Sequence, residues 1–208
     1  KLMGGKKWFW VGMKKLNTQI PGSYNDFIQA YAACCRFADA QIGRVLDALD
    51  SSPRRDNTIV VLWSDHGFHL GEKDHIEKFG LWEKTNRIPF IVVAPGVTAA
   101  DSRCDTPVDL SVLYPTLLEL VGLPADSKCD GVSIMKILKE PETEWERPAL
   151  MTYGLGNHAV RSDRWRYIRY ADGTEELYDH MKDPHEWTNI AADPKYREVI
   201  TSHKNWLP

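Results

Sequence analysis

The chain has 208 residues, of which 43% are hydrophobic and 26% charged, an ordinary globular composition that allows one substantial core. A formal net charge of -3 lacks the basic excess that a nucleic-acid backbone demands, so we expect no nucleic-acid partner. No apolar run approaches the roughly 20 residues of a membrane helix, and the start of the chain has neither the apolar core nor the cleavage site of a signal peptide. We therefore expect no membrane partner.

The first segments predict a strand followed by a long helix. Bulky and β-branched residues in WFWVG, at 8–12, are typical of a short buried strand. From Ser23 to Asp50 apolar residues recur every three or four positions, which is the spacing of one helix face. Ser23 or Asn25 is a suitable residue type to cap the start of this helix.

Two apolar runs and a second helix follow. The β-branched run at 58–64 is expected for a strand buried on both faces of a parallel sheet, and a similar run occupies 88–96. The segment 109–123 is amphipathic and is ended by Gly122 and Pro124, which predicts a helix. Strands and helices in alternation indicate an α/β layer with helices on the faces of its sheet.

The pattern changes near residue 148. Short alternating segments with turn signals, such as Ala171-Asp172-Gly173, indicate antiparallel strands, and the segment 193–207 predicts a closing helix. The expected fold class is therefore α/β, with helices on a mostly parallel sheet over residues 1–147. A small antiparallel β subdomain with a C-terminal helix is expected over residues 148–208.

The four cysteines predict no disulfide scaffold, and none of them has the C-x-x-C spacing of a zinc site. Cys34 and Cys35 lie in the helical pattern, where filling the core is favoured over redox chemistry. Cys104 and Cys129 bracket a segment and are able to pair in an oxidising compartment. The sequence leaves that pairing open.

A loop rich in ionisable residues follows the first β-branched run. Asp65 and His66 stand at its origin, where loops of α/β sheets bind ligands, and both can reach one cation if the chain bends at Gly67. A carboxylate with an imidazole suits a divalent cation, and an oxygen-rich remainder of the shell favours calcium or magnesium. His66 with His69 alone suggests zinc, but no further ligand has the usual spacing. A solvated loop without function is the alternative.

At this loop the sequence resembles the sulfatases of the alkaline-phosphatase superfamily, especially the iduronate-sulfatase-like branch. The matching words are SDHG, LGE, a lysine thirteen positions after the aspartate, LWE and RIPFIVVAPG. FADAQIGRVLDAL before them and ELYDHMKDPHEWTNIAADPKY after them extend the resemblance over most of the chain from about residue 24 onward.

The resemblance implies a site and a reaction. Asp65 and His66 match the family's second pair of calcium ligands, and Lys78 matches the lysine that contacts the sulfate. The family's nucleophile is a formylglycine, made from a cysteine or serine in C-x-P-S-R, which attacks sulfur in its hydrated form. A dication and an ammonium supply the electrostatic stabilisation that such a transition state needs. The resemblance also implies a periplasmic, secreted or lysosomal protein, and leaves the oligomeric state open.

Two departures from the family pattern qualify the resemblance. The chain contains no C-x-P-S-R and no opening pair of metal-binding aspartates, so it is similar only to the C-terminal portion of a sulfatase. Near the start, where the family has K-P-H, Lys15 fits but Asn17 replaces the histidine. Asparagine cannot transfer a proton near neutrality. Either the alignment slips there or a catalytic contact is lost.

Weaker candidates for substrate binding lie in two places. His69 and His75 are near the predicted site and are candidates to contact a sugar, with simple solvent exposure as the alternative. His158 and Arg161 are candidates to reach the site from the C-terminal sheet and to pair with a carboxylated or sulfated sugar, with an ordinary strand face as the alternative. Trp82 is the first candidate for a sugar-stacking platform, although such residues more often belong to a core.

Three functional hypotheses follow. The leading one is a fragment of a sulfatase, inactive by itself, whose full-length form acts on a sulfated polysaccharide or glycosaminoglycan. The second is a phosphodiester or phosphonate hydrolase of the same superfamily, which needs more histidine and aspartate ligands than the loop supplies. The third is a non-catalytic sugar-binding or structural module, which the missing nucleophile and Asn17 favour.

Overall fold

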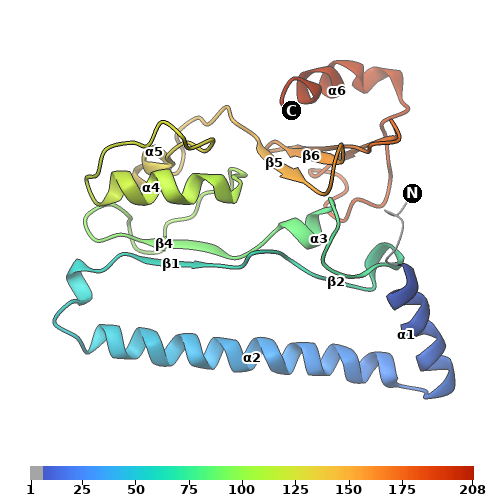
Figure 1. Cartoon of the computed structure of the whole chain (residues 1–208), viewed down its shortest axis with the longest axis horizontal. Helices are drawn as coiled ribbons and strands as arrows, with labels where there is room; N and C mark the ends of the chain where they lie inside the picture. The colour runs from blue at the N-terminus through green and yellow to red at the C-terminus, as the bar shows by residue number, and fades with distance from the viewer. Residues whose placement is uncertain (1–6) are drawn as a thin grey trace.

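The structure, a computed structural model, describes residues 7–208 and begins with two helices. Helix α1 (Lys7–Gln19) meets the long helix α2 (Ser23–Asp50) at a sharp corner (Figure 1). The strand predicted over 8–12 is therefore wrong. A five-residue apolar run is too short for its period to separate strand from helix, and no proline interrupts the chain before Pro21.

The long helix α2 confirms the prediction over 23–50, but two details differ. Its N-cap is Gly22, without a side-chain cap, so neither Ser23 nor Asn25 has that role. Cys34 and Cys35 are exposed free thiols and do not fill a core. The reason is that α2 contains no buried residue, because the other described elements leave most of its surface uncovered.

Strands β1 (Val60–Trp63) and β4 (Phe90–Val93) form the predicted apolar runs but pair antiparallel, with Trp63 opposite Phe90. The parallel pairing is thus a wrong prediction for these two strands. An apolar run does not encode direction, and the segment between the strands contains no crossover that would return the chain to the same end. In Figure 1, α2 runs on one side of this pair and α4 on the other.

The connection between β1 and β4 carries the ionisable loop. It contains a hairpin of two short antiparallel strands, β2 (His69–Leu70) and β3 (Ile76–Glu77), and the short helix α3 (Glu83–Asn86) precedes β4. The corner of α1 and α2 touches this loop: the Tyr24 hydroxyl donates to the Leu70 carbonyl, and the Tyr31 and Phe68 rings lie 5.2 Å apart. The loop is therefore held from the helical side.

The predicted helix at 109–123 is confirmed as a 3-10 turn, Leu110–Val112, leading into α4 (Leu113–Leu120). The Asp109 carboxylate caps it by accepting the Ser111 N–H at 3.0 Å. The apolar side of this helix packs with α5 (Met135–Lys139) and with Phe90 of β4 around the buried Ile137. Cys104 and Cys129 are free thiols, so the pairing that the sequence left open does not occur here.

The antiparallel C-terminal sheet is confirmed, and it is covered on both faces. One face packs on Leu81 and Trp82 of the ionisable loop, and the other on the closing helix around Ile200. The two regions that the sequence separated at 147/148 therefore share a core. The sheet runs in the order β5 (Ala149–Thr152), β6 (His158–Arg161), β7 (Trp165–Arg169), β8 (Glu175–Asp179), and a 3-10 turn, Pro194–Tyr196, leads into α6 (Arg197–Lys204).

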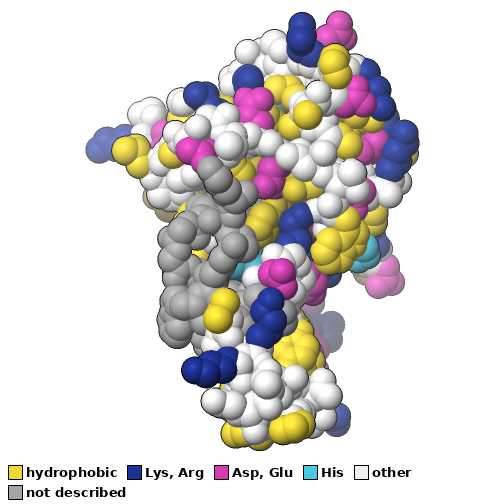
Figure 2. Space-filling model, turned by 90° about the vertical axis from the view of Figure 1, so that its right-hand side faces the viewer, with side chains coloured by type: hydrophobic (Ala, Val, Ile, Leu, Met, Phe, Trp, Pro, Cys, Tyr) yellow, Lys and Arg dark blue, Asp and Glu magenta, His cyan; other side chains and the backbone are white. Residues whose placement is uncertain are grey.

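The described helices and the surface charges bear on the partners that the chain can have. Within residues 7–208 no helix combines the length and the apolar character that crossing a membrane requires. On the face drawn in Figure 2, basic and acidic side chains are interspersed among the described residues, with hydrophobic side chains between them. This face therefore does not present one large field of a single sign.

Candidate functional site

Asp65 and His66 lie directly after β1 with their ligand atoms on the same side. An Asp65 carboxylate oxygen is 3.7 Å from His66 Nε2, and His66 Nδ1 lies 2.7 Å from the Gly67 carbonyl oxygen. A carbonyl only accepts, so this contact assigns the ring proton to Nδ1. The Nε2 lone pair is then left on the side of Asp65. A ring oriented in this way through its other nitrogen is the usual arrangement of a metal-binding histidine.

Gly67 fixes this pair against helix α3. A Cβ at Gly67 would overlap the Lys84 carbonyl, and the Gly67 N–H donates to the Thr85 carbonyl at 2.8 Å. Only glycine allows such a close approach of two backbone segments. These contacts hold the Gly67 backbone against α3, and the bend of the chain lies at Asp65 and not at Gly67, where we predicted it.

The segment that carries Lys78 has an unusual backbone. Lys73, Asp74, Glu77 and Phe79 all have positive φ angles, between 56° and 88°. Each such non-glycine residue costs on the order of 1–3 kcal/mol, which the surroundings have to offset. Lys78 is half-buried, and its ammonium lies 5.2 Å from the centre of the Phe79 ring. Whether it meets the Asp65–His66 pair on one ligand stays a prediction.

His69 and His75 are buried beneath this segment, with their rings edge to face at 5.2 Å. Burial, and then the neighbouring His75, lower the pKa of His69 to about 4, so its ring is neutral at pH 7. In this conformation neither ring reaches a ligand at the surface. Their assignment as sugar contacts remains untested, and their burial favours a supporting role for both.

Trp82 belongs to the same buried cluster, and its prediction as a sugar-stacking platform is wrong. It is 8% exposed, and its Nε1 donates to the Glu176 carboxylate at 2.7 Å. The ammonium of Lys73 covers one of its rings at 4.9 Å. The C-terminal sheet folds over this residue, so its ring faces are not available to a sugar.

Arg161 and His158 lie at opposite ends of β6, so the structure does not bring them together. Arg161 Nε is 3.5 Å from the Glu83 carboxylate, and burial lowers the pKa of this guanidinium. His158 Nδ1 lies 2.9 Å from the Thr152 hydroxyl at the turn between β5 and β6. Their role in substrate binding is a prediction that no bound ligand tests, and Arg161 already has an internal partner.

Asn17 lies on α1, and its side-chain oxygen accepts the Tyr24 N–H at 3.2 Å. It therefore helps to close the corner between α1 and α2. Lys15 is exposed on the same helix. These positions do not decide between a slipped alignment and a lost histidine.

Sequence reasoning missed a cluster of buried charges next to the loop. Glu186 is 1% and Arg166 is 2% exposed, and the Arg166 Nε lies 2.7 Å from a Glu186 oxygen. The N–H does not point at that oxygen, so the contact is an ion pair and not a hydrogen bond. His180 donates from Nε2 to Glu186 at 2.9 Å. The sequence feature that could have indicated this cluster is Arg166, a charged residue inside the alternating strand WRYIR.

Glu83, His180 and Glu186 have ligand atoms within 4.8 Å of one another, a spacing that also suits a metal ion. Arg166 contacts both carboxylates, and Arg161 contacts Glu83 as well. The negative charge of this cluster is therefore already balanced, and a dication would lie beside two guanidinium groups. The donor set fits an ion-pair network. Asp65 and His66 remain the better metal ligands.

Comparison with protein families gives two matches. The family described as Sulfatase matches residues 10–123, and the family described as N-sulphoglucosamine sulphohydrolase, C-terminal, matches residues 71–207. The two matches overlap over the ionisable loop. Together they cover nearly all of the described chain.

Curated relatives with similar sequences are named as sulfatases. A protein named Sulfatase, from Formosa agariphila, is 45% identical over 187 residues, which are 90% of this chain and 37% of the relative. A Delta 4,5-hexuronate-2-O-sulfatase from Bacteroides thetaiotaomicron is 30% identical over 198 residues, which are 89% of this chain and 41% of the relative. The chain thus spans less than half the length of these relatives.

Two solved structures show the same fold. BT4656 in complex with its substrate D-glucosamine-2-N,6-O-disulfate has a TM-score of 0.77 and 26% identity, covering 88% of this chain and 40% of that one. The phosphonate monoester hydrolase of Agrobacterium radiobacter has a TM-score of 0.71 and 26% identity, covering 80% of this chain and 37% of that one. These matches confirm the predicted α/β fold class.

Proposed function

Because the chain belongs to the sulfatase family of the alkaline-phosphatase superfamily, we propose that it is the C-terminal part of a longer sulfatase, here called the parent. The parent hydrolyses sulfate esters. The observation that carries this proposal is the Asp65–His66 pair, with ligand atoms 3.7 Å apart, in a loop that also carries Lys78. The share of the relatives that the chain spans, 37% and 41%, supports a longer parent.

Asp65 and His66 would hold one divalent cation, for which calcium is the best candidate. The Nε2 lone pair of His66 and the exposed Asp65 carboxylate supply two ligands, and the rest of the parent would supply the others. When bound, the cation neutralises charge on an anionic ester. The backbone contacts of Gly67 keep the two ligands in place before the cation arrives.

Lys78 would contact the sulfate group. An ammonium is a compact charge with three donors, which suits the non-bridging oxygens of a sulfate ester. The nucleophile, a formylglycine in this family, is expected in the part of the parent that precedes this chain. One relative is named as a hexuronate sulfatase, and BT4656 was solved with a sulfated glucosamine as its substrate, which supports a sulfated carbohydrate as the substrate class.

Hydrolysis of phosphonate monoesters is the second candidate, because a hydrolase of that class has the same fold at a TM-score of 0.71. Assay of the parent on an aryl sulfate and on the matching aryl phosphonate separates the two. We expect the sulfate ester to be the better substrate, since the loop contributes one carboxylate and one imidazole to the metal. A preference for the phosphonate would overturn the assignment.

The test of the proposed function is Lys78→Ala in the parent. We expect kcat/KM on an aryl sulfate to fall roughly 30- to 1,000-fold, a loss of about 2 to 4 kcal/mol, as for removal of one donor to a developing oxyanion. Lys128→Ala, at an exposed lysine in the segment between α4 and α5, is the control and should leave the rate unchanged. An unchanged rate in Lys78→Ala would remove Lys78 from the site.

A further inference from the structure

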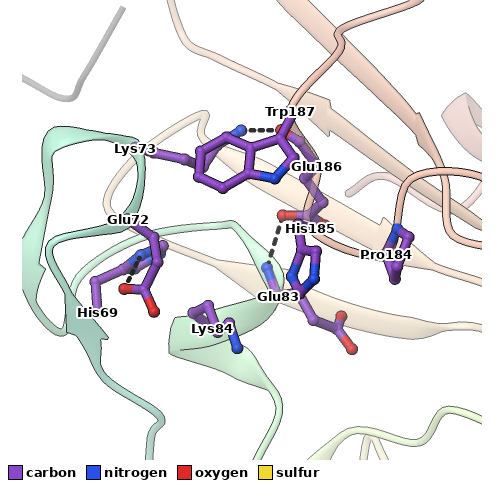
Figure 3. A pocket seen from close by; sticks show the side chains of 9 residues that line it. All are labelled: His69, Glu72, Lys73, Glu83, Lys84, Pro184, His185, Glu186 and Trp187. Carbon is purple, nitrogen blue, oxygen red and sulfur yellow. Dashed lines mark hydrogen bonds and ion pairs between the residues drawn. The ribbon is translucent and has the colours of Figure 1, made fainter.

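Glu186 touches both ends of the segment that carries Lys78 (Figure 3). Its backbone carbonyl accepts a hydrogen bond from the Lys73 ammonium, and its carboxylate accepts the Glu83 N–H at 2.9 Å. Lys78 lies midway, five residues from each of these contacts. A single residue of the C-terminal part therefore closes an eleven-residue segment at its two ends.

Arg166, on β7, reinforces the second of these ends. Its Nη1 donates to the Leu81 carbonyl at 3.0 Å, and its Nη2 contacts the Glu83 carboxylate. The same guanidinium forms the ion pair with Glu186. Glu186 and Arg166 thus hold the end of the segment together, one through a backbone N–H and the other through a backbone carbonyl.

The charges of this pair are maintained in the folded protein. Burial alone raises the pKa of Glu186, but Arg166, His180 and the Glu83 N–H outweigh it and hold the pKa below its ordinary value. Glu186 is therefore ionised at neutral pH. Two buried charges cost several kcal/mol to desolvate, and apolar residues of similar size often stabilise a fold as well. The pair thus points to a requirement for geometry at this place.

The segment itself needs such a restraint. Lys73, Glu77 and Phe79 have positive φ angles of 57°, 88° and 71°. Backbone in this region relaxes unless the surroundings over-determine it. Fixing both ends of the segment prevents that relaxation, and it keeps Lys78 in one place with respect to the Asp65–His66 pair.

We infer that Glu186 and Arg166 are positioning residues for Lys78. They act through the backbone of residues 73–83 and do not touch the substrate. The inference rests on the proposed function, because it assigns to Lys78 the contact with the sulfate ester. A misplacement of a catalytic group by about 1 Å can cost on the order of 100-fold in rate, so the loss of the restraint is measurable.

A double-mutant cycle in the parent tests the inference. Glu186→Gln keeps the shape and the backbone carbonyl but removes the charge that faces Arg166. We expect it to lower kcat on an aryl sulfate roughly 10- to 100-fold and to change KM by less than about 3-fold. In the Lys78→Ala background the same substitution should change kcat by less than about 3-fold, because the group that it positions is gone.

Asp179→Asn is the matched control. Asp179, the last residue of β8, is 3% exposed and pairs at 2.6 Å with Arg164, which lies just before β7, so it is also a buried acid with an arginine partner. This variant should lower the melting temperature, as Glu186→Gln does, and leave kcat within about 2-fold. If Glu186→Gln fails to fold, Lys73→Met removes the other contact of Glu186 and should show the same dependence on Lys78.

The outcomes are distinct. If Lys78→Ala lowers the rate and Glu186→Gln then lowers it further by the same factor as in the wild type, the positioning role is wrong and the proposed function stands. If Lys78→Ala alone leaves the rate unchanged, the proposed function and the positioning role both fail. Equal losses of kcat in Asp179→Asn and Glu186→Gln would also overturn the inference.

Discussion

The C-terminal sheet and the helix α2 differ in how completely they are covered. In the sheet, Ile168 faces the ionisable loop, Leu177 faces α6, and both are fully buried. In α2 no residue is buried, and Phe37 and Val45 are each 68% exposed. Both regions have amphipathic sequences. The difference shows that a hydrophobic pattern predicts an element but does not reveal whether the same chain supplies the partner that covers it.

The exposed apolar residues are not confined to α2. Ile91 and Val93 of β4 are 51% exposed and Trp63 of β1 is 46% exposed. A surface of this kind marks an interface. The chain spans 37% and 41% of two curated relatives. We therefore expect the remainder of the parent to cover the exposed apolar residues of α2, β1 and β4. In the proposed function, the covered region contains the residues that position the loop, and the remainder of the parent supplies the residues that complete the site.

The largest effect expected from this difference is on activity. The 208-residue chain alone should not hydrolyse an aryl sulfate, because the proposed function gives it two ligands of the cation and its sequence has no C-x-P-S-R nucleophile. The measurement is release of the phenol from an aryl sulfate, with the parent as the positive control. Turnover above background by the purified chain would contradict the proposed nucleophile. It would also contradict the expectation that the site is completed by residues outside this chain.

Two substitutions that shorten a side chain should show that the covered sheet and the uncovered helix α2 contribute differently to stability. Leu177→Ala should lower the free energy of unfolding by about 2 to 5 kcal/mol in the chain and in the parent alike, because the residue is buried in both. Phe37→Ala should change it by less than about 0.5 kcal/mol in the chain, where the ring is exposed, and by more than about 1 kcal/mol in the parent. Urea unfolding measures both. Equal costs of Phe37→Ala in the two proteins would mean that α2 stays exposed.

A third expected effect is a dependence of stability on pH, and it concerns His69 in the ionisable loop. His69 has a pKa of about 4 in the folded protein and 6.5 as its ordinary value. Above pH 6.5 the ring is neutral in both states, so its contribution to stability is constant. Between pH 6.5 and about 4 only the unfolded chain binds the proton, which lowers the free energy of unfolding by about 3 kcal/mol in total.

The comparison with His69→Gln isolates this contribution from the carboxylates. The free energy of unfolding of His69→Gln, measured by urea at several pH values, should fall less steeply between pH 6.5 and 4.5. His185→Gln, at an exposed histidine, should follow the wild type. Parallel curves for all three proteins would show that His69 is accessible to protons in the folded state.

The sequence predicted features that depend on near neighbours in the chain. The period of α2, the alternation in the C-terminal sheet and the adjacency of Asp65 and His66 are all local, and the structure contains them. The predicted parallel direction of β1 against β4 and the predicted strand at 8–12 were wrong, because a short apolar run is compatible with either direction and with either type of element. Local pattern therefore predicted the long helix and the C-terminal strands, but neither the type of the short run at 8–12 nor the pairing of β1 with β4.

The part of the site that the sequence did not reveal depends on contacts between distant segments. Trp82 is buried because the C-terminal sheet folds over it, and Glu176, 94 residues later in the chain, accepts its N–H. Glu186 and Arg166 reach the loop across similar separations. Neither a charge in a turn nor an arginine in a strand indicates by itself that it is buried beside an opposite charge.

Among residues 7–208, β1 and β4 pair only with each other, so each has one side of backbone donors and acceptors without a strand beside it. Such sides readily add strands from other chains. A preparation of this stretch alone is thus prone to self-association through β1 and β4, and co-expression with the remainder of the proposed parent should keep it dispersed.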